Sequence, residues 1–342
     1  MKSQKRSTLT IRLCAAIAGC VIGLSRITGS EAAVQPTGPA AGNYPNKPIR
    51  MIDAFGAGGG TDYIARLIGQ KLAERFNQSV IVDNRGGAGG NIGAEIAAKA
   101  TPDGYNLFMG VVPALAPSVS LYSRLPYNVM KDFAFITLVA SGTYVVFVHP
   151  SLPVKSVAEL VALARSSPGK LAYGSTGVGG PAHLVGELLK SRAGVDILHV
   201  AYKGGSPPIF TAIANGEVQI SYLNIASVLP LIRAGRVKAL AVTAAKRARS
   251  ASDIPTVAES GLPGFDVTPH YGVLTPIATP GAIVKLLNVE IGKILQLPDI
   301  QTTFTAQGLE AGGSTPEEFR QIMQAEIEKW AKVIKDAGIK GD

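Results

Sequence analysis

The chain has 342 residues, of which 46% are hydrophobic and 17% are charged. This composition excludes a disordered or collagen-like chain, and the length predicts two domains at roughly 150 residues each. Glycine (39 residues) and proline (22 residues) are plentiful, so we expect many tight loops between short apolar elements.

Residues 1–32 are typical of a secretory signal peptide. Four cationic residues precede an apolar stretch over 13–24, and Ser30-Glu31-Ala32 follows as a small-x-small cleavage site. The stretch of about 12 residues is shorter than the roughly 20 that a membrane-spanning helix requires. We therefore predict cleavage and a periplasmic location, with a flexible leader over 33–43. A bacterial lipobox that ends at Cys20 leaves a lipid anchor open as an alternative.

The mature chain is predicted to be only mildly basic. Of the 33 cationic and 24 acidic residues, five and one lie in residues 1–32, so the net charge falls from +9 to +5. The basic run that remains, Lys246-Arg247-Ala248-Arg249, lacks the stacking aromatics of a nucleic-acid site. Both cysteines, Cys14 and Cys20, belong to the signal peptide. We therefore expect no nucleic-acid partner and no disulfide.

Predicted strands and helices alternate from residue 49 onward. Strands are predicted over 49–55, 80–83, 105–112, 135–140, 144–149, 171–174, 197–202, 219–223 and 239–243. Helices are predicted over 61–76, 91–99, 157–164, 182–193, 206–215, 227–234, 281–296 and 315–337, from apolar residues at helical spacing. This order predicts an α/β fold with mixed, mostly parallel sheets flanked by helices. Ligand sites are expected beyond the carboxyl ends of the strands.

The loop over 55–62 leads from a strand into a helix and contains three consecutive glycines. Glycines allow a ligand to approach the backbone, and the N–H groups of a first helical turn favour an anion. Thr61 or Asp62 could also serve simply as a helix cap. A phosphate-binding loop of the Walker type would need a Gly-Lys-Ser/Thr sequence, so nucleoside triphosphate binding is disfavoured.

The segment over 173–183 repeats this strand-to-helix arrangement. The hydroxyls of Ser175 and Thr176 and the free amides of the loop predict a second anion-binding loop. Its glycines loosely match a dinucleotide fingerprint, but Asp196 precedes the next strand, whereas the fingerprint requires an acid after it. Ser175 and His183 do not form a hydrolase motif either. A cofactor-dependent enzyme is therefore the weaker alternative.

The remaining candidate loops contain Tyr202-Lys203-Gly204 and Tyr222-Leu223-Asn224. The four histidines lack the spacing of a metal site, and no pair of carboxylates stands out for acid–base work. We therefore predict no catalytic residue, no metal and no cofactor. Two anion-binding loops without a catalytic set indicate a binding protein.

Several motifs, in order, resemble the Bug-type periplasmic solute-binding proteins of tripartite tricarboxylate transporters. They are Tyr-Pro-x-Lys-Pro-Ile-Arg (44–50), Phe-x-x-Gly-Gly-Gly-Thr-Asp (55–62), Asn84-Arg85-x-x-Ala88-Gly89-Gly90-Asn91, Thr-Pro-Asp-Gly-Tyr (101–105), Val-His-Pro-Ser (148–151), Tyr202-Lys203-Gly204 and Pro-Thr-Val-Ala-Glu-x-Gly (255–261). The resemblance covers nearly all of 44–340. It implies a two-lobed periplasmic-binding-protein fold of type II, a small organic carboxylate as ligand, delivery to membrane permease subunits, and a monomer.

The resemblance also implies lobes and a binding site. Lobe 1 would comprise 44–141 plus 266–342 and lobe 2 would comprise 142–265, joined by a hinge of two crossings. The family's binding loops correspond here to Phe55, Ala57, Gly58, Gly59, Thr61, Asp62, Val112, Pro113, Ser175, Thr176, Gly177, Pro181, His183, Tyr202, Gly204, Leu223, Asn224, His270 and Tyr271.

Departures from the family pattern bear on the ligand. Many relatives carry an aspartate where this chain has Leu223, and an aspartate could pair with a ligand ammonium group. Leu223 therefore disfavours amino acids and favours a mono- or dicarboxylate, with an aromatic acid left open. A ligand sensor for a signalling partner remains an alternative to uptake, and the identity and affinity of the ligand are not predicted.

Overall fold

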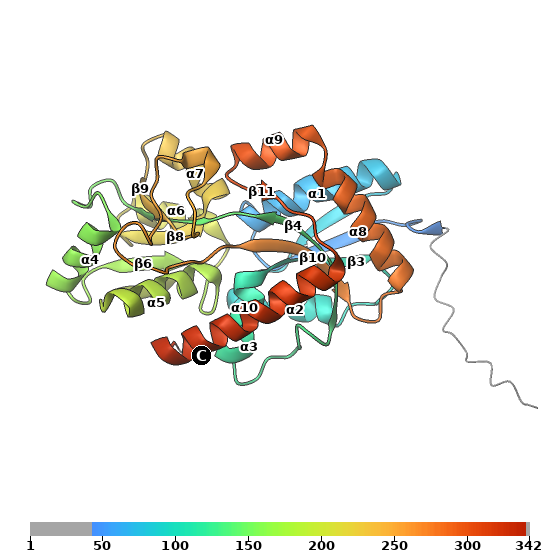
Figure 1. Ribbon diagram of the computed structural model, residues 1–342, viewed down its shortest axis with the longest axis horizontal. Coiled ribbons are helices and arrows are strands. Elements are labelled where there is room, and N and C mark those ends of the chain that lie inside the picture. Colours follow the sequence, from blue (N-terminus) through green and yellow to red (C-terminus); the bar gives the residue numbers. More distant parts are fainter. Residues whose placement is uncertain (1–42, 340–342) are drawn as a thin grey trace, which may run out of the picture. The chain divides into compact units, whose positions relative to one another are not determined.

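Two mixed β-sheets flanked by helices form the computed structural model, which describes residues 43–339 (Figure 1). The first sheet has the order β11-β4-β10-β3-β1-β2 and the second β7-β6-β8-β5-β9. The first contains β1 (Ile49–Asp53), β2 (Val80–Asn84), β3 (Asn106–Val111), β4 (Phe133–Ser141), β10 (His270–Pro276) and β11 (Glu310–Ala311). The second contains β5 (Tyr144–Val148), β6 (Ala172–Ser175), β7 (Leu198–Ala201), β8 (Ile220–Asn224) and β9 (Lys238–Val242).

Every predicted strand and helix lies within two residues of an observed one. The helices are α1 (Gly60–Phe76), α2 (Asn91–Ala98), α3 (Val112–Leu121), α4 (Val157–Ser166), α5 (Pro181–Ala193), α6 (Ser206–Ala214), α7 (Ile225–Arg233), α8 (Gly281–Leu295), α9 (Pro298–Ala306) and α10 (Pro316–Ala337). The prediction omitted α3, α9, β10 and β11. Two prolines, Pro113 and Pro117, conceal α3 in the sequence, although Pro113 lies in the first turn, where a missing N–H costs little.

The expectation of mostly parallel sheets was wrong. Four strand pairings are parallel and five are antiparallel. The antiparallel pairs involve β4, β5 and β10, which are the strands that flank the passages between the sheets. A strand that leaves a sheet and one that returns to it run in opposite directions, so these neighbours pair antiparallel.

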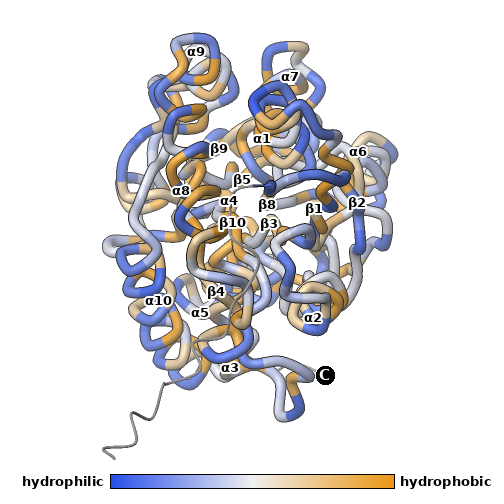
Figure 2. Tube along the Cα trace, turned by 90° about the vertical axis from the view of Figure 1, so that its right-hand side faces the viewer, coloured by the Kyte–Doolittle hydropathy of each residue, from blue (hydrophilic) through white to orange (hydrophobic). Residues whose placement is uncertain are grey.

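Strand alternation divides the core around the first sheet into two layers. Leu107 and Met109 of β3 pack with the apolar faces of α1 and α8, whereas Phe108 points to α2, α3 and α10, as a period of two requires. In α10 the apolar stripe is buried at Phe319 and Trp330. Figure 2 shows this helix banded with hydrophobic and hydrophilic residues.

The chain passes between the sheets twice. It leaves β4 for β5 through Gly142 and Thr143, and it returns from β9 to β10 through residues 243–269. Two buried threonines tie these passages together. Thr143 Oγ1 accepts from the N–H of Thr243 at 3.1 Å, and Thr243 Oγ1 accepts from Tyr144 N–H at 3.1 Å and donates to Val267 C=O at 2.7 Å. The lobe boundaries given above stay a prediction.

Within residues 43–339, no helix combines the length and apolar character needed to cross a bilayer. The predicted signal peptide over 1–32, the leader up to residue 42 and Cys20 lie outside the described residues.

Candidate functional site

A pocket lies between the two sheets, at the carboxyl ends of β1, β3, β6 and β8. Ligands bind in this position in open α/β sheets. The cavity volume is about 60 Å³. Its lining residues are Phe55, Gly56, Gly59, Gly60, Thr61, Val111, Tyr144, Thr176, Pro181, Ala182, Gly205, Ser206, Tyr222, Leu223, Asn224 and Tyr271.

Four helices begin at this pocket. Gly60, Pro181 and Ser206 are the first residues of α1, α5 and α6, and Asn224 is the N-cap of α7. Each helix N-terminus carries the positive end of the helix dipole, equivalent to about half an elementary charge. The N–H groups of Ile225 and Ala226 in α7 are already donated, to Thr143 C=O and Asn224 Oδ1. The first turns of α5 and α6 contain prolines, which have no N–H. None of the described residues that line the pocket is charged. The positive ends of the helix dipoles therefore suit the pocket to an anion.

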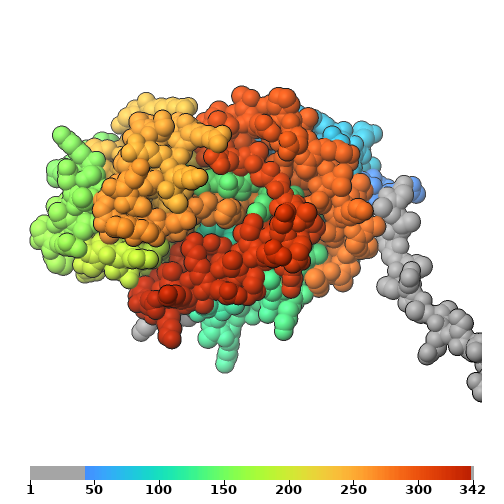
Figure 3. Space-filling view, in the orientation of Figure 1, coloured from blue at the N-terminus to red at the C-terminus, as the bar shows by residue number. Residues whose placement is uncertain are grey.

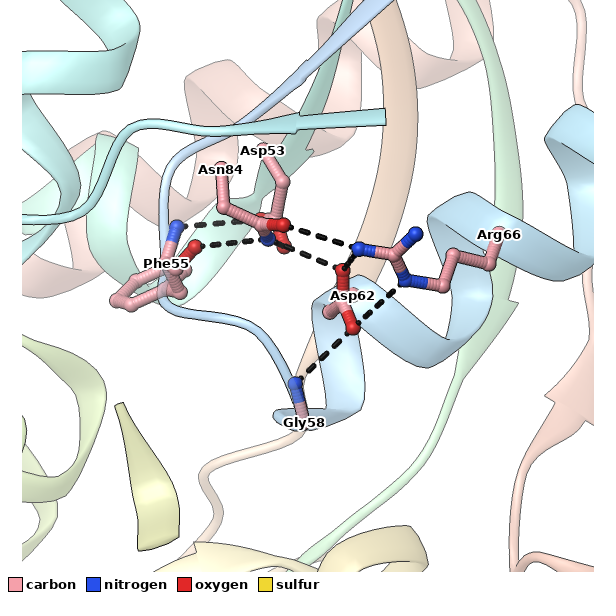
Figure 4. A network of polar contacts seen from close by, with 6 residues as sticks. All are labelled: Asp53, Phe55, Gly58, Asp62, Arg66 and Asn84. Carbon is pink, nitrogen blue, oxygen red and sulfur yellow. Dashed lines mark hydrogen bonds and ion pairs between the residues drawn. The ribbon is translucent and has the colours of Figure 1, made fainter. Parts of the chain in front are cut away.

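A polar network holds the glycine loop between β1 and α1 (Figure 4). Asn84 Nδ2 donates to the Asp53 carboxylate at 3.1 Å, to Phe55 C=O at 3.1 Å and to the Asp62 carboxylate at 3.0 Å. Asp62 also accepts from Gly58 N–H and from Arg66 Nε, both at 3.0 Å. The Asp62 carboxylate is thus used to shape the loop, and it does not line the pocket.

Asp53 is fully buried at the end of β1. Its carboxylate accepts hydrogen bonds from Phe55 N–H at 3.2 Å and from Asn84. Burial raises the pKa of Asp53 from 3.8 to about 7, because desolvation outweighs the hydrogen bonds, one from Thr61 included, that lower it. The glycine loop is therefore hydrogen-bonded to a carboxyl group, that of Asp53, whose pKa lies near neutral pH.

Two of the predicted binding residues organise the second glycine loop. Ser175 Oγ accepts from Gly177 N–H at 3.1 Å and lies 2.6 Å from His199 Nε2. His183 Nδ1 accepts from Gly179 N–H at 3.1 Å. Burial and the neighbouring His183 lower the pKa of His199 to about 4, so this imidazole is neutral near pH 7. These side chains shape the loop, and neither Ser175 nor His183 lines the pocket.

Backbone meets backbone where the loops of the two sheets touch. A Cβ on Gly56 would lie 2.8 Å from Gly204 O, and one on Gly89 would lie 2.7 Å from Gly180 N and from Val178 O. We call the contacts of Gly56 and Gly89 with these residues the glycine seam. The Tyr122 hydroxyl donates to Val178 C=O at 3.0 Å beside it. Side chains at the two glycines would hold the loops apart.

Asn224 and Tyr222 lie at the end of β8 in the pocket wall. Asn224 Oδ1 accepts from Ala226 N–H at 2.8 Å, and its Nδ2 donates to the hydroxyl of Tyr271 on the other sheet. The buried Tyr222 hydroxyl has no hydrogen-bond partner among the described residues. Buried polar atoms rarely lack a partner, so this hydroxyl is available to one that enters the pocket.

The structure brings together only some of the predicted site residues. Those that line the pocket are Phe55, Gly59, Thr61, Thr176, Pro181, Leu223, Asn224 and Tyr271. Those outside its lining are Ala57, Gly58, Asp62, Val112, Pro113, Ser175, Gly177, His183, Tyr202, Gly204 and His270. The other lining residues were not among the predicted site residues, although Gly56, Gly60, Ala182 and Tyr222 belong to loops that the sequence analysis singled out; they are Gly56, Gly60, Val111, Tyr144, Ala182, Gly205, Ser206 and Tyr222. Gly56 and Gly60 stand within a glycine loop and could have been included, whereas nothing in the sequence marks Tyr144.

Comparisons with known proteins cover most of the chain. Residues 64–339 match the model of the tripartite tricarboxylate transporter family receptor. Protein BugT of Bordetella pertussis is 36% identical over 302 residues, which cover 88% of this chain and 92% of BugT. The solved structure of R. palustris Rpa4515 with adipate is 37% identical, with a TM-score of 0.83, and covers 87% of this chain and 99% of its own. The structure of MatC from Rhodopseudomonas palustris with bound malate is 30% identical, with a TM-score of 0.81. The match covers 85% of this chain and 100% of the MatC chain.

We predict a pH dependence of stability that depends on Asp53. A folded-state pKa raised from 3.8 to about 7 means that this group stabilises the fold fully below about pH 4, and that the contribution is lost as the pH rises through 7. Thermal unfolding of the wild type and of Asp53→Asn between pH 5 and pH 8 measures this contribution of Asp53 to stability. The Tm advantage of the wild type over the variant should shrink as the pH rises. A difference in Tm that stays constant over this range would contradict the prediction.

Proposed function

The chain belongs to the tripartite tricarboxylate transporter receptor family, and we propose that it captures a small organic mono- or dicarboxylate between its two sheets for delivery to the permease subunits of such a transporter. The predicted resemblance to this family and the α/β fold with two mixed sheets are confirmed. Family members are solute receptors, so the chain is not an enzyme, and the cofactor-dependent alternative is set aside.

The observation that carries the proposal is the meeting of four helix N-termini at a pocket lined by uncharged side chains. A carboxylate placed there is stabilised by the four helix dipoles and accepts N–H hydrogen bonds from the first turn of α1, without having to displace a side-chain counter-ion. Because α1 flanks the first sheet and α5, α6 and α7 flank the second, a bound ligand bridges both. The contacts it makes only in the closed form are what stabilise that form.

The ligand class is proposed from the neighbours and from the pocket. Rpa4515 with adipate and MatC with malate are structures with dicarboxylates, which supports a dicarboxylate here. Leu223 lines the pocket and is 5% exposed, so it offers no counter-ion to an ammonium group. The unpartnered Tyr222 hydroxyl offers a hydrogen bond to a carboxylate or hydroxyl oxygen.

Location and organisation follow as parts of the same proposal. We propose a monomeric receptor in the periplasm with lobe 1 over 44–141 plus 266–342 and lobe 2 over 142–265. The predicted signal peptide supports the location, as does the similarity to the periplasmic binding protein BugD, which is 30% identical with a TM-score of 0.83. The proposed lobe boundaries are supported by the two places at which the chain passes from one sheet to the other.

A thermal-shift screen of the mature chain tests the ligand class. A ligand present at 100 times its Kd should stabilise the fold by about 2.7 kcal/mol, which raises the Tm by several degrees. We expect such a shift with a dicarboxylate such as adipate or malate. The proposal fails if no acid shifts the Tm while a nucleotide cofactor does.

A second prediction concerns charge at residue 223. We expect aspartate and glutamate not to bind at micromolar concentration, because Leu223 provides no partner for their ammonium group. Leu223→Asp should weaken dicarboxylate binding about tenfold or more, since two like charges a few ångströms apart repel strongly in a buried pocket. Leu223→Asn, of the same size but neutral, is the matched control in calorimetric titration. Equal losses in the two variants would rule out an electrostatic cause.

A third prediction concerns the glycine seam. Gly89→Ala places a methyl group 2.7 Å from two backbone atoms of the opposite loop, a clash of about 1–3 kcal/mol by analogy with overpacked cores. The Kd of the dicarboxylate found in the screen should therefore rise about tenfold. Gly89 has a φ of +66°, and Gly216, with a φ of +73° and nothing within 4 Å of an added Cβ, is the control for backbone strain alone. If Gly216→Ala raised the Kd as much as Gly89→Ala, the effect would come from backbone strain, and the role of the glycine seam in binding would be contradicted.

A further inference from the structure

A second cavity lies where the chain passes between the sheets. Figure 3 shows a hollow between the orange segment that follows β9 and the red-orange segment that follows α9. We call it the hinge cavity, and its volume is about 520 Å³. Its lining residues are Ser141, Gly142, Thr143, Ala244, Ala245, Lys246, Arg247, Ala248, Arg249, Ser250, Thr268, Gln301, Thr305, Gly308, Leu309, Glu310 and Ala311.

Three cations form one wall of the hinge cavity, and they are the basic run noted in the sequence. Lys246 has no ion-pair or hydrogen-bond partner among residues 43–339. Arg247 pairs with Glu259 at 2.9 Å. Arg249 approaches Glu310 only at 3.5 Å, and both side chains are largely exposed. Such an exposed pair contributes little stability, so a stronger acceptor can replace Glu310 beside Arg249.

A buried hydroxyl lies at the edge of the same cavity. Ser250 lines the hinge cavity, and its Oγ is buried without a hydrogen-bond partner among the described residues. A buried hydroxyl that stays unpaired costs free energy, and it is rare in native structures. None of the described residues that line the cavity is aromatic, so they offer no surface on which a nucleobase would stack.

The walls of the hinge cavity belong to both sheets. Residues 244–250 continue from β9 of the second sheet, whereas Gln301 and Thr305 lie on α9, which leads into β11 of the first. Gly142 and Thr143, which join β4 to β5, line it as well. A ligand that touches both walls therefore has contacts that depend on the angle between the sheets.

We propose that the hinge cavity binds a small oxyanion with two negative charges, and that this binding alters the affinity of the pocket between the sheets for its ligand. A volume of this size is typical of a small-molecule site. The guanidinium of Arg249 and the ammonium of Lys246 are the groups that recognise such oxyanions. Binding at one site that depends on the angle between the sheets changes binding at the other by the same factor in both directions.

Calorimetric titration of the mature chain with inorganic phosphate, at constant ionic strength, tests the site. Lys246→Ala/Arg249→Gln removes two cations of the hinge cavity and should weaken phosphate binding about tenfold or more. Lys155→Ala/Arg236→Gln removes two exposed cations that lie outside the cavity lining and should leave it unchanged. Equal phosphate binding in the wild type and in the hinge variant would overturn the proposal.

A third variant separates this site from the proposed ligand pocket. Leu223→Asp repels anions from the pocket, so phosphate binding that survives in Leu223→Asp and is lost in Lys246→Ala/Arg249→Gln assigns the anion to the hinge cavity. The reverse pattern would place phosphate in the pocket and overturn the inference. The Kd of the dicarboxylate should also differ with and without saturating phosphate in the wild type, and not in the hinge variant. An unchanged Kd in the wild type would overturn the coupling between the two sites.

Discussion

The loop between β1 and α1 has few side chains that could fix its conformation. Hydrogen bonds from the side-chain amide of Asn84 fix it instead. Its Nδ2 ties Asp53, Phe55 and Asp62 into one network, and Asp62 in turn accepts from Gly58. A glycine-rich loop loses more conformational entropy on ordering than other loops, so it needs such external hydrogen bonds. The position of the first helix N-terminus at the pocket depends on this network.

In the proposed function, the affinity of the pocket for an anion comes from the backbone. Asp62 and Arg66 neutralise each other behind the loop at 2.9 Å, and His199 stays neutral because it is buried. The four helix dipoles then act on a pocket whose lining, among the described residues, is uncharged. Backbone donors cannot swing away, so the site is preorganised once the loops are ordered.

The glycine seam and the hinge cavity lie on opposite sides of the two chain passages and differ in their packing. On the ligand side the glycine seam allows backbone to touch backbone, so contact between the loops requires the absence of side chains. On the other side the hinge cavity stays open and carries cationic groups. Thr143 and Thr243 lie between them and bind the two passages to each other. The proposed coupling between the two sites would act through this junction, in which the hydroxyls of Thr143 and Thr243 are hydrogen-bonded.

Periodicity and loop composition, which are local properties, determined most of the fold in advance. Apolar spacing located the helices and strands, and the glycine loops located the ends of β1 and β6 at the site. Tertiary structure decided which side chains face the pocket. Asp62, Ser175 and His183 turn to loop amides, since nearby N–H groups need acceptors. Tyr144 reaches the pocket because the second sheet packs against the loops of the first, a long-range arrangement that no local pattern encodes. The antiparallel pairing of β10 has the same origin, because it depends on where the returning chain re-enters the sheet.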